Sequence, residues 1–172
     1  AGKIDKSVFP GLQGGPHMNA VAAIAITLGK AQTESFRQYA RDVLTNAKAL
    51  ANALLGAQAS LVTGGTDNHM LVLDTVKSFG LDGRKAEETL DAVSITTNKQ
   101  IIPDDPNPPL RPSGIRVGTP AATARGMTAD DMERLADWMV RALQAPDDAS
   151  RLAEIDAEVR AFCEQFPVPG ID

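Results

Sequence analysis

Residues 113–119 read Ser113-Gly114-Ile115-Arg116-Val117-Gly118-Thr119, and a proline follows directly. One charged residue between two apolar residues is typical of a strand, which we predict at residues 115–118 and expect Thr119-Pro120 to end. Successive strand residues point to opposite faces, so Arg116 faces away from Ile115 and Val117. Its guanidinium therefore either points to solvent or clamps a carboxylate through two hydrogen bonds. The local sequence leaves both open.

The neighbouring segments predict an α+β fold. Further strands are expected at residues 59–62, 70–75 and 95–98, and the first two can pair as an antiparallel hairpin. Apolar residues at helical spacing predict helices at residues 18–28, 34–55, 83–92, 129–143 and 149–166. The first of these is apolar on nearly all sides and is expected to be buried. The chain therefore reads as a long helical arm followed by a small lobe of three or four short strands.

Two segments rich in proline or glycine are predicted to be loops. Residues 7–16 hold three glycines and two prolines, and residues 101–114 hold five prolines. The second loop is stiff, and its polar residues are Asp104, Asp105, Asn107 and Arg111. Long loops inside compact domains tend to bind something, although a rigid surface connection explains this one equally well.

The pair Gly14-Gly15 stands just before a predicted helix, with Pro16 suited to its first turn. Backbone N–H groups can converge there on an anion such as phosphate, and the helix dipole favours negative charge. No Gly-Lys-Ser/Thr follows, so the segment is not a Walker A loop. A plain turn is the alternative interpretation.

Composition excludes several classes of protein. The chain has 172 residues and a formal charge of −5 (17 − 22); residues 129–172 carry −7 (4 − 11) and the rest +2 (13 − 11). Nucleic-acid binding is not expected, because the basic residues do not cluster and the chain has one Trp and one Tyr. No apolar run is long enough to span a membrane and no signal peptide opens the chain, so we expect a cytoplasmic protein.

Metal binding and a catalytic triad are not expected either. The chain has one cysteine, Cys163, which lies on an apolar helical face and is interpreted as a core residue. Its two histidines, His17 and His69, are expected to serve as capping or core residues rather than catalytic ones. The polar run at residues 66–69 is explained by Asx turns.

Four ordered motifs together resemble the C-terminal part of the serine (glycine) hydroxymethyltransferases, over about residues 4–168. The motifs are Val8-Phe9-Pro10-Gly11-Leu12-Gln13-Gly14-Gly15-Pro16; Gly64-Gly65-Thr66-Asp67-Asn68-His69; Thr97-Asn98-Lys99 with Pro103-Asp104-Asp105-Pro106; and Ser113-Gly114-Ile115-Arg116-Val117-Gly118-Thr119-Pro120-Ala121. The resemblance implies a fold-type I, pyridoxal 5'-phosphate-dependent transferase of one-carbon metabolism and glycine biosynthesis. It also implies the interconversion of serine and tetrahydrofolate with glycine and 5,10-methylenetetrahydrofolate, and a homodimer or dimer of dimers.

The resemblance also implies roles for individual residues. Arg116 corresponds to the arginine that binds the amino-acid carboxylate, and Gly14 and Gly15 to the pair that reaches the cofactor phosphate of the neighbouring subunit. The proline-rich loop corresponds to the segment beside the folate. Gln100 stands where the family often has a folate-contacting Asn. Arg125 matches an arginine doublet of the family, and Ala124 departs from it.

The same resemblance implies that a catalytic lysine is missing from this sequence. In the family the Schiff-base lysine follows a Thr-His pair shortly upstream of the Phe-Pro-Gly loop, and none of the seven lysines stands in such a context. We therefore expect residues 1–56 to be the end of the large domain with the connecting helices, residues 57–172 to be the small domain, and the chain to be inactive alone. Two alternatives remain: a non-catalytic oligomerisation module, and another fold-type I enzyme such as a threonine aldolase, which would lack the folate loop.

Overall fold

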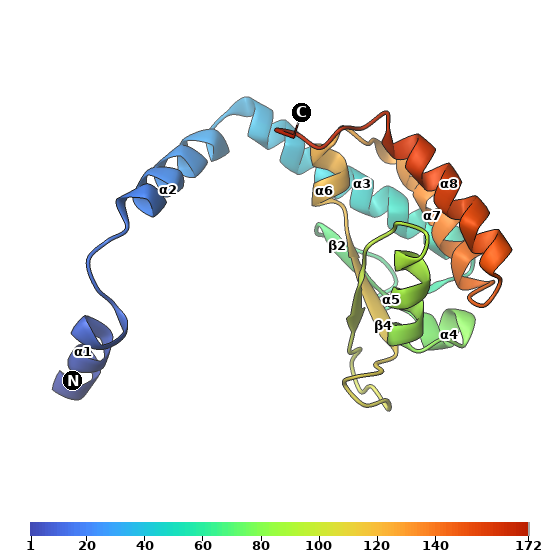
Figure 1. Ribbon diagram of the computed structural model, residues 1–172, viewed down its shortest axis with the longest axis horizontal. Coiled ribbons are helices and arrows are strands. Elements are labelled where there is room, and N and C mark those ends of the chain that lie inside the picture. Colours follow the sequence, from blue (N-terminus) through green and yellow to red (C-terminus); the bar gives the residue numbers. More distant parts are fainter. Residues whose placement is uncertain (172) are drawn as a thin grey trace. The chain divides into compact units, whose positions relative to one another are not determined.

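A computed structural model describes residues 1–171, which divide into two compact units, residues 1–38 and residues 39–171. The first unit contains α1 (Gly2–Lys6), η1 (Ser7–Leu12), α2 (Met18–Ala31) and the start of α3 (Glu34–Gly56) (Figure 1). The prediction of a loop at residues 7–16 is wrong for residues 7–12, which form wide helical turns. Phe9 and Pro10 nevertheless have non-helical backbone angles, so the proline interrupts these turns as its geometry requires.

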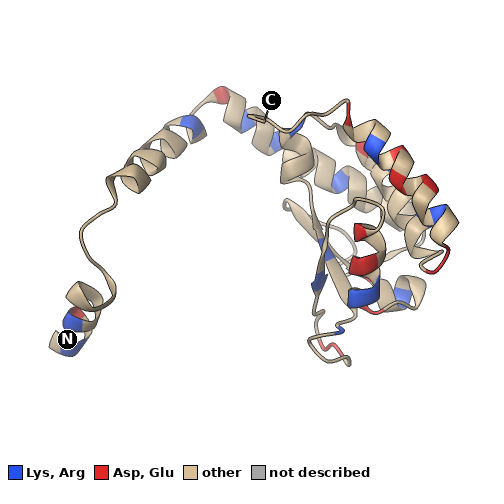
Figure 2. Ribbon diagram, in the orientation of Figure 1, with Lys and Arg blue, Asp and Glu red and all other residues tan. Residues whose placement is uncertain are grey.

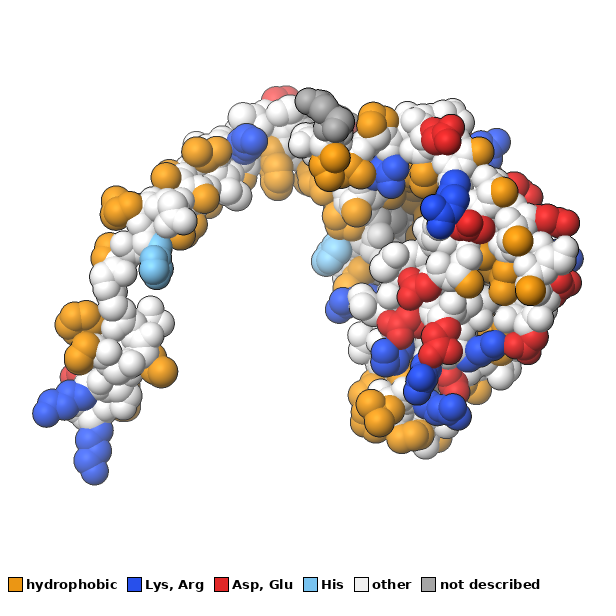
Figure 3. Space-filling view, viewed as in Figure 1, with side chains coloured by type: hydrophobic (Ala, Val, Ile, Leu, Met, Phe, Trp, Pro, Cys, Tyr) orange, Lys and Arg blue, Asp and Glu red, His pale blue; other side chains and the backbone are white. Residues whose placement is uncertain are grey.

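Helix α2 forms as predicted, but the expectation that it is buried is wrong. None of its residues is buried, and Met18, Ile24 and Ile26 are 67%, 59% and 61% exposed. Figure 3 shows apolar side chains along the helix. Its sequence contains one charged residue, Lys30, and Figure 2 shows the rest of the helix without charge. The pattern indicates a helix that needs cover on several sides, and its own unit contains too few residues to supply that cover.

The second unit is built on a four-stranded antiparallel sheet in the order β1-β2-β4-β3. Its strands are β1 (Ser60–Leu61), β2 (Met70–Asp74), β3 (Asn98–Gln100) and β4 (Gly114–Gly118). The predicted hairpin of the first two strands is confirmed. The third prediction, at residues 95–98, is wrong in position, because pairing with β4 begins only at Asn98.

Helices cover one face of this sheet. They are α3, α4 (Thr75–Phe79), α5 (Gly83–Asp91), α6 (Pro120–Ala124), α7 (Ala129–Leu143) and α8 (Ala149–Cys163). The apolar residues Leu71, Leu73, Ile115 and Val117 join residues of α3, α5, α7 and α8 in one core. Figure 1 shows these helices beside the sheet. The predicted helices are confirmed and the fold is α+β, whereas α4 and α6 were not predicted.

Side-chain caps fix the starts of several helices. Asp82 accepts a hydrogen bond from the backbone N–H of Lys85 at 2.8 Å and so caps the start of α5. Thr128 and Asp131 form a capping box at the start of α7. Asp74 caps α4 in the same manner by accepting from Lys77 N at 2.9 Å.

Glu158 of α8 links this helix to α7. Both of its oxygens accept from the guanidinium of Arg141, each at 2.8 Å, and Oε2 also accepts from Trp138 Nε1 at 2.7 Å. Hydrogen bonds from Arg141 and then Trp138 lower the pKa of Glu158 from 4.5 to about 2. Since the folded state binds this proton less tightly than the unfolded state, the link stabilises the fold above about pH 4.5 and is lost as the pH falls towards 2.

We predict that Glu158→Gln lowers stability at pH 7 and weakens its dependence on pH. Urea unfolding of the chain between pH 7 and pH 3 measures both effects, and the difference from the unmutated chain should shrink at low pH. The matched control is Glu154→Gln, since Glu154 is exposed on the same helix and makes no side-chain hydrogen bond or ion pair within residues 1–171. Parallel pH profiles for the unmutated chain and Glu158→Gln would contradict the prediction.

Candidate functional site

Arg116 lies at the centre of the sheet face that the helices leave open. In β4 it is paired with Val72 of β2 on one side and Asn98 of β3 on the other. Ile115 and Val117 are buried and Arg116 is exposed, which confirms the predicted alternation. Its Nη2 donates to Asn98 Oδ1 at 3.3 Å. Within residues 1–171 no carboxylate pairs with it, so most of its five donors are available to a ligand.

On the face of Arg116, β4 presents no other side chain, although Ile102 packs over Gly114, which is buried. Gly114 and Gly118 are two residues away along the strand and therefore point to the same face without a side chain. Gly114 is also required by packing, because a Cβ atom there would lie 2.8 Å from Cγ2 of Ile102 and 2.9 Å from the carbonyl oxygen of Leu73. A planar acid can thus approach the guanidinium without meeting a neighbouring β4 side chain.

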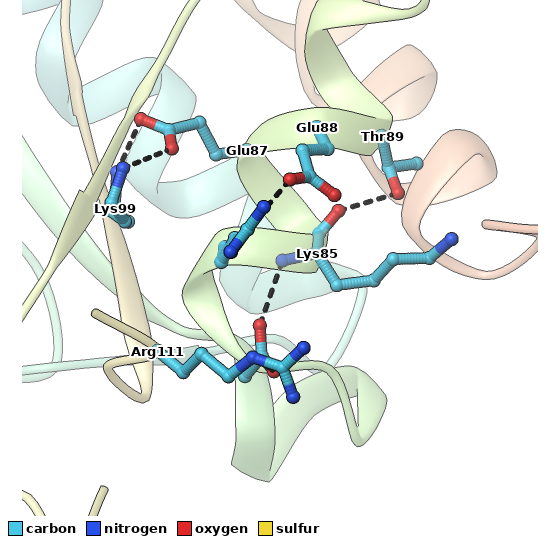
Figure 4. Close-up of polar contacts among 8 residues, drawn as sticks. Lys85, Glu87, Glu88, Thr89, Lys99 and Arg111 are labelled. Carbon is cyan, nitrogen blue, oxygen red and sulfur yellow. Dashed lines mark hydrogen bonds and ion pairs between the residues drawn. The ribbon is translucent and has the colours of Figure 1, made fainter. Parts of the chain in front are cut away.

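Strand β3 is held from the opposite face by α5. Glu87 accepts from Lys99 Nζ at 2.7 Å and from Lys99 N at 3.1 Å (Figure 4). The hydrogen bond from the Lys99 side chain is the main cause of the lowered pKa of Glu87. Because Lys99 points to the helices, its neighbours Asn98 and Gln100 are placed on the face of Arg116.

Gln100 is half-buried at the end of β3, opposite Gly114. Its Nε2 donates to the carbonyl oxygen of Ile101 at 3.0 Å, while no partner of its Oε1 is found in the described part of the chain. The structure therefore brings Gln100 to the same sheet face as Arg116, with the sheet setting the spacing between them.

The proline-rich loop joins β3 to β4 and contains no helix or strand, as predicted. Of its four polar residues, Asp105 and Asn107 turn inward and bind Ser113, whereas Asp104 is exposed. Arg111 Nε lies 4.0 Å from Asp82 Oδ2. The sequence identified these residues as a group but did not distinguish the structural ones from the exposed ones.

The end of this loop is clamped by the starts of α4 and α5, a contact that the sequence did not predict. Ser113 O accepts from Thr75 N at 2.9 Å and from Thr75 Oγ1 at 3.0 Å, both at the start of α4. Pro112 O accepts from Gly83 N, at the start of α5, at 2.6 Å. These bonds fix the point at which the chain enters β4. The sequence signals for this clamp are weak: Thr75 follows a predicted strand, and Gly83 follows Asp82.

Gly14 and Gly15 lie in the first unit, in the turn before α2. Their backbone N–H groups have no acceptor within residues 1–171. A Cβ atom at either position would have no neighbour within 4 Å, and neither residue has a positive φ angle. The chain's own packing therefore does not explain why both positions are glycine.

The remaining candidates do not form a site. His17 and His69 are exposed, and His17 makes no side-chain cap, so the expectation of capping or core histidines is wrong. Asn68 forms the expected Asx turn by accepting from Met70 N at 2.9 Å, and Cys163 packs against the core as predicted. Within residues 1–171 no three His, Cys, Asp or Glu residues are grouped to hold a metal, and no helix is long and apolar enough to cross a membrane.

The structure therefore describes an α+β lobe whose open sheet face carries an arginine with no carboxylate partner within residues 1–171. Comparison with known proteins gives this lobe a family: the family model for serine hydroxymethyltransferase matches residues 1–139. The chain is 50% identical over 171 residues to a serine hydroxymethyltransferase of Sorangium cellulosum (strain So ce56), covering 99% of this chain and 40% of that protein.

Two further relatives agree. A serine hydroxymethyltransferase of Rhodopirellula baltica is 47% identical over 167 residues, and serine hydroxymethyltransferase 2 of Mesorhizobium japonicum is 48% identical over 171 residues. They are covered to 40% and 39% of their length, and this chain to 97% and 99%. The chain belongs to the serine hydroxymethyltransferase family, which confirms the resemblance, and it spans about 40% of the length of these relatives.

The clamp on β4 predicts that Gly83 tolerates no side chain. A Cβ atom there would lie 2.2 Å from the carbonyl oxygen of Gly114 and 3.1 Å from that of Pro112, and both atoms are backbone. We expect Gly83→Ala to destabilise the chain by about 1–3 kcal/mol, the usual cost of overpacking, measured by urea unfolding. The control is Gly56→Ala at the end of α3, where a Cβ meets nothing within 4 Å and the change should stay within about 1 kcal/mol. Equal effects of the two substitutions would contradict the clamp.

Proposed function

We propose that this chain is the part of a serine hydroxymethyltransferase that binds the amino-acid carboxylate and borders the folate. The reaction interconverts serine and tetrahydrofolate with glycine and 5,10-methylenetetrahydrofolate, as a step of one-carbon metabolism and glycine biosynthesis. The observation that carries the proposal is the unpaired guanidinium of Arg116 on the open sheet face. Membership of the family supplies the reaction.

In this proposal Arg116 binds the carboxylate shared by serine and glycine. A guanidinium presents two parallel N–H groups that match the two oxygens of a carboxylate. Asn98 steadies it through the single hydrogen bond at 3.3 Å and leaves other donors available to the substrate. Since β4 is paired on both edges, the arginine is presented by a rigid element rather than by a mobile loop.

Gly14 and Gly15 would bind the phosphate of pyridoxal 5'-phosphate in the neighbouring subunit of a homodimer or dimer of dimers. The described residues fit that role, because two backbone N–H groups without acceptors precede the start of α2 and no Cβ atom blocks an approaching phosphate. When bound, the cofactor supplies an electron sink for bonds to the substrate α-carbon. The exposed apolar surface of α2 is consistent with a subunit or domain interface here.

Gln100 and the proline-rich loop would border the folate. Gln100 keeps the carboxamide of the more frequent asparagine and adds one methylene, so its Oε1 and Nε2 would reach further over the open sheet face. Arg125, from the family's arginine doublet, is already engaged: it donates to the carbonyl oxygens of Phe166 at 2.7 Å and Cys163 at 3.1 Å. Its role here is to fix the end of α8, and Ala124 beside it has no guanidinium.

The larger assembly follows from the same family. We propose a fold-type I enzyme in the cytoplasm, in which residues 1–56 complete the large domain and its connecting helices and residues 57–172 form the small domain. The Schiff-base lysine would come from outside this sequence. Lys99, the lysine of β3, is on the sheet face opposite Arg116 and is paired with Glu87 (Figure 4), so it cannot take that role beside the substrate.

We predict that Arg116→Ala in the full-length enzyme weakens serine binding by a factor of about 100 or more, as expected when a charge-assisted bidentate contact is lost. Arg116→Lys should restore little, because an ammonium cannot form the two parallel bonds. Titration of serine without folate measures the affinity. Stability should change little, since Arg116 is exposed. Serine affinity unchanged in both variants would overturn the assignment.

We also predict that the 172-residue chain alone does not form a functional cofactor site. Titration with pyridoxal 5'-phosphate should produce no saturable visible absorbance band that changes on addition of glycine, and no serine cleavage. The same titration of Lys99→Ala serves as a control for surface lysines reacting nonspecifically. A saturable, glycine-responsive band from this chain would show that it contains a competent lysine, contrary to the proposal.

A further inference from the structure

Asp105 contacts both ends of the proline-rich loop, residues 101–113. Near the start of the loop, Ile102 N donates to its Oδ2 at 3.2 Å. At the end of the loop, Ser113 N donates to the same oxygen at 2.9 Å and Ser113 Oγ donates to Oδ1 at 2.6 Å. One carboxylate therefore ties the residues that leave β3 to the residue that enters β4.

Asn107 completes this network. Its backbone N–H donates to Asp105 Oδ1 at 3.0 Å, and its Nδ2 donates to Ser113 Oγ at 2.9 Å. The Ser113 hydroxyl therefore accepts a hydrogen bond from Asn107 Nδ2 and donates one to Asp105 Oδ1, so its hydrogen and its oxygen are both used. Burial of Asp105 alone would raise its pKa, but the hydrogen bonds from Ser113, Asn107 and Ile102 lower it well below its ordinary range. Four donors face the carboxylate, and no acceptor is found beside it within residues 1–171. A protonated carboxyl group would need such an acceptor, so the arrangement fits the charged form.

The rest of the loop has few other anchors. Residues 108–111 are exposed. Their polar contacts within residues 1–171 are one hydrogen bond, from Arg111 N to Pro108 O at 2.8 Å, and the exposed ion pair of Arg111 Nε with Asp82 Oδ2 at 4.0 Å. Strand β4, by contrast, is paired on both edges and is entered through the clamp of Thr75 and Gly83. Loss of the Asp105 network should therefore release the loop while Arg116 stays in place.

We propose that Asp105 is a positioning residue that latches the proline-rich loop in the conformation in which residues 106–111 border the folate. The inference rests on the proposed function, in which this loop lies beside tetrahydrofolate. It assigns to Asp105 an effect on folate affinity and none on serine affinity. The prolines stiffen the segments between anchor points. Beyond the β3–β4 pairing at Gln100 and Gly114, the Asp105 carboxylate is the group that bonds both Ile102 and Ser113 within residues 1–171.

The test is Asp105→Asn in the full-length enzyme. An amide replaces one acceptor oxygen by an NH₂ group, so at least one of the three backbone N–H groups loses its partner. We expect the KM for tetrahydrofolate to rise about tenfold, as for the loss of a hydrogen bond to a charged group, and the affinity for serine without folate to change less than about twofold. Ser113→Ala removes one donor and should produce a smaller shift in the same direction.

The matched control is Asp104→Asn, which removes the same charge one residue earlier. Asp104 is exposed, and within residues 1–171 its side chain has no hydrogen bond or ion pair. Its φ of 54° is a conformation that asparagine adopts readily. The KM for tetrahydrofolate should not change. An equal rise in both variants would attribute the effect to net charge and overturn the latch.

Amide hydrogen exchange of the full-length enzyme without ligands gives a readout independent of turnover. Asp105→Asn should speed exchange in peptides covering residues 101–113 and leave those covering β4 unchanged. Unchanged exchange in the loop, unchanged folate KM, or an equal loss of serine affinity would each contradict the proposal. If the unmutated enzyme shows no tetrahydrofolate-dependent turnover, both the proposed function and the folate role of Asp105 fail. Hydrogen exchange still tests, in that case, whether Asp105 holds the proline-rich loop in place.

Discussion

The pairing of β4 on both edges is the constraint on which the site depends. Its register places Ile115 and Val117 in the core and therefore Arg116 on the open face. A slip of one residue would expose two apolar side chains and bury a guanidinium, and a buried unpaired charge is far more costly than an exposed one. The same alternation thus stabilises the second unit and presents the arginine. A change in the register of β4 would therefore alter both the core residues and the position of Arg116.

The register itself is fixed at the entrance to β4. The carbonyl groups of Pro112 and Ser113 receive the backbone N–H groups that begin α5 and α4, and the missing side chains of Gly83 and Gly114 allow this close approach. Helix starts have unpaired N–H groups, and loop carbonyls need donors, so each satisfies the other. The loop before β4 is therefore anchored to the scaffold at one end by backbone bonds and tied across by the Asp105 carboxylate.

The sequence predicts well those features that depend on local periodicity. The long helices, the hairpin and the outward direction of Arg116 all follow from spacing alone. It does not predict β3 correctly, because Ile95 and Thr97 alternate into the core before pairing starts at Asn98. Nor does it separate Asp105 from Asp104: the two are identical in type and adjacent, and only the position of Ser113 in space decides which one is bonded. Helix α4 is a single capped turn and has no period to detect.

The prediction that α2 is buried fails for a different reason. Periodicity can show that a helix needs cover, but it does not show where the cover comes from. In residues 39–171 several unusual features have internal explanations: Gly83 and Gly114 admit a backbone contact, and Asp105 meets four donors. In residues 1–38 the exposed apolar side chains of α2 and the pair Gly14 and Gly15 have none within their own unit. Features without an internal cause point to surfaces outside the unit, as expected of a chain that spans about 40% of the length of its relatives.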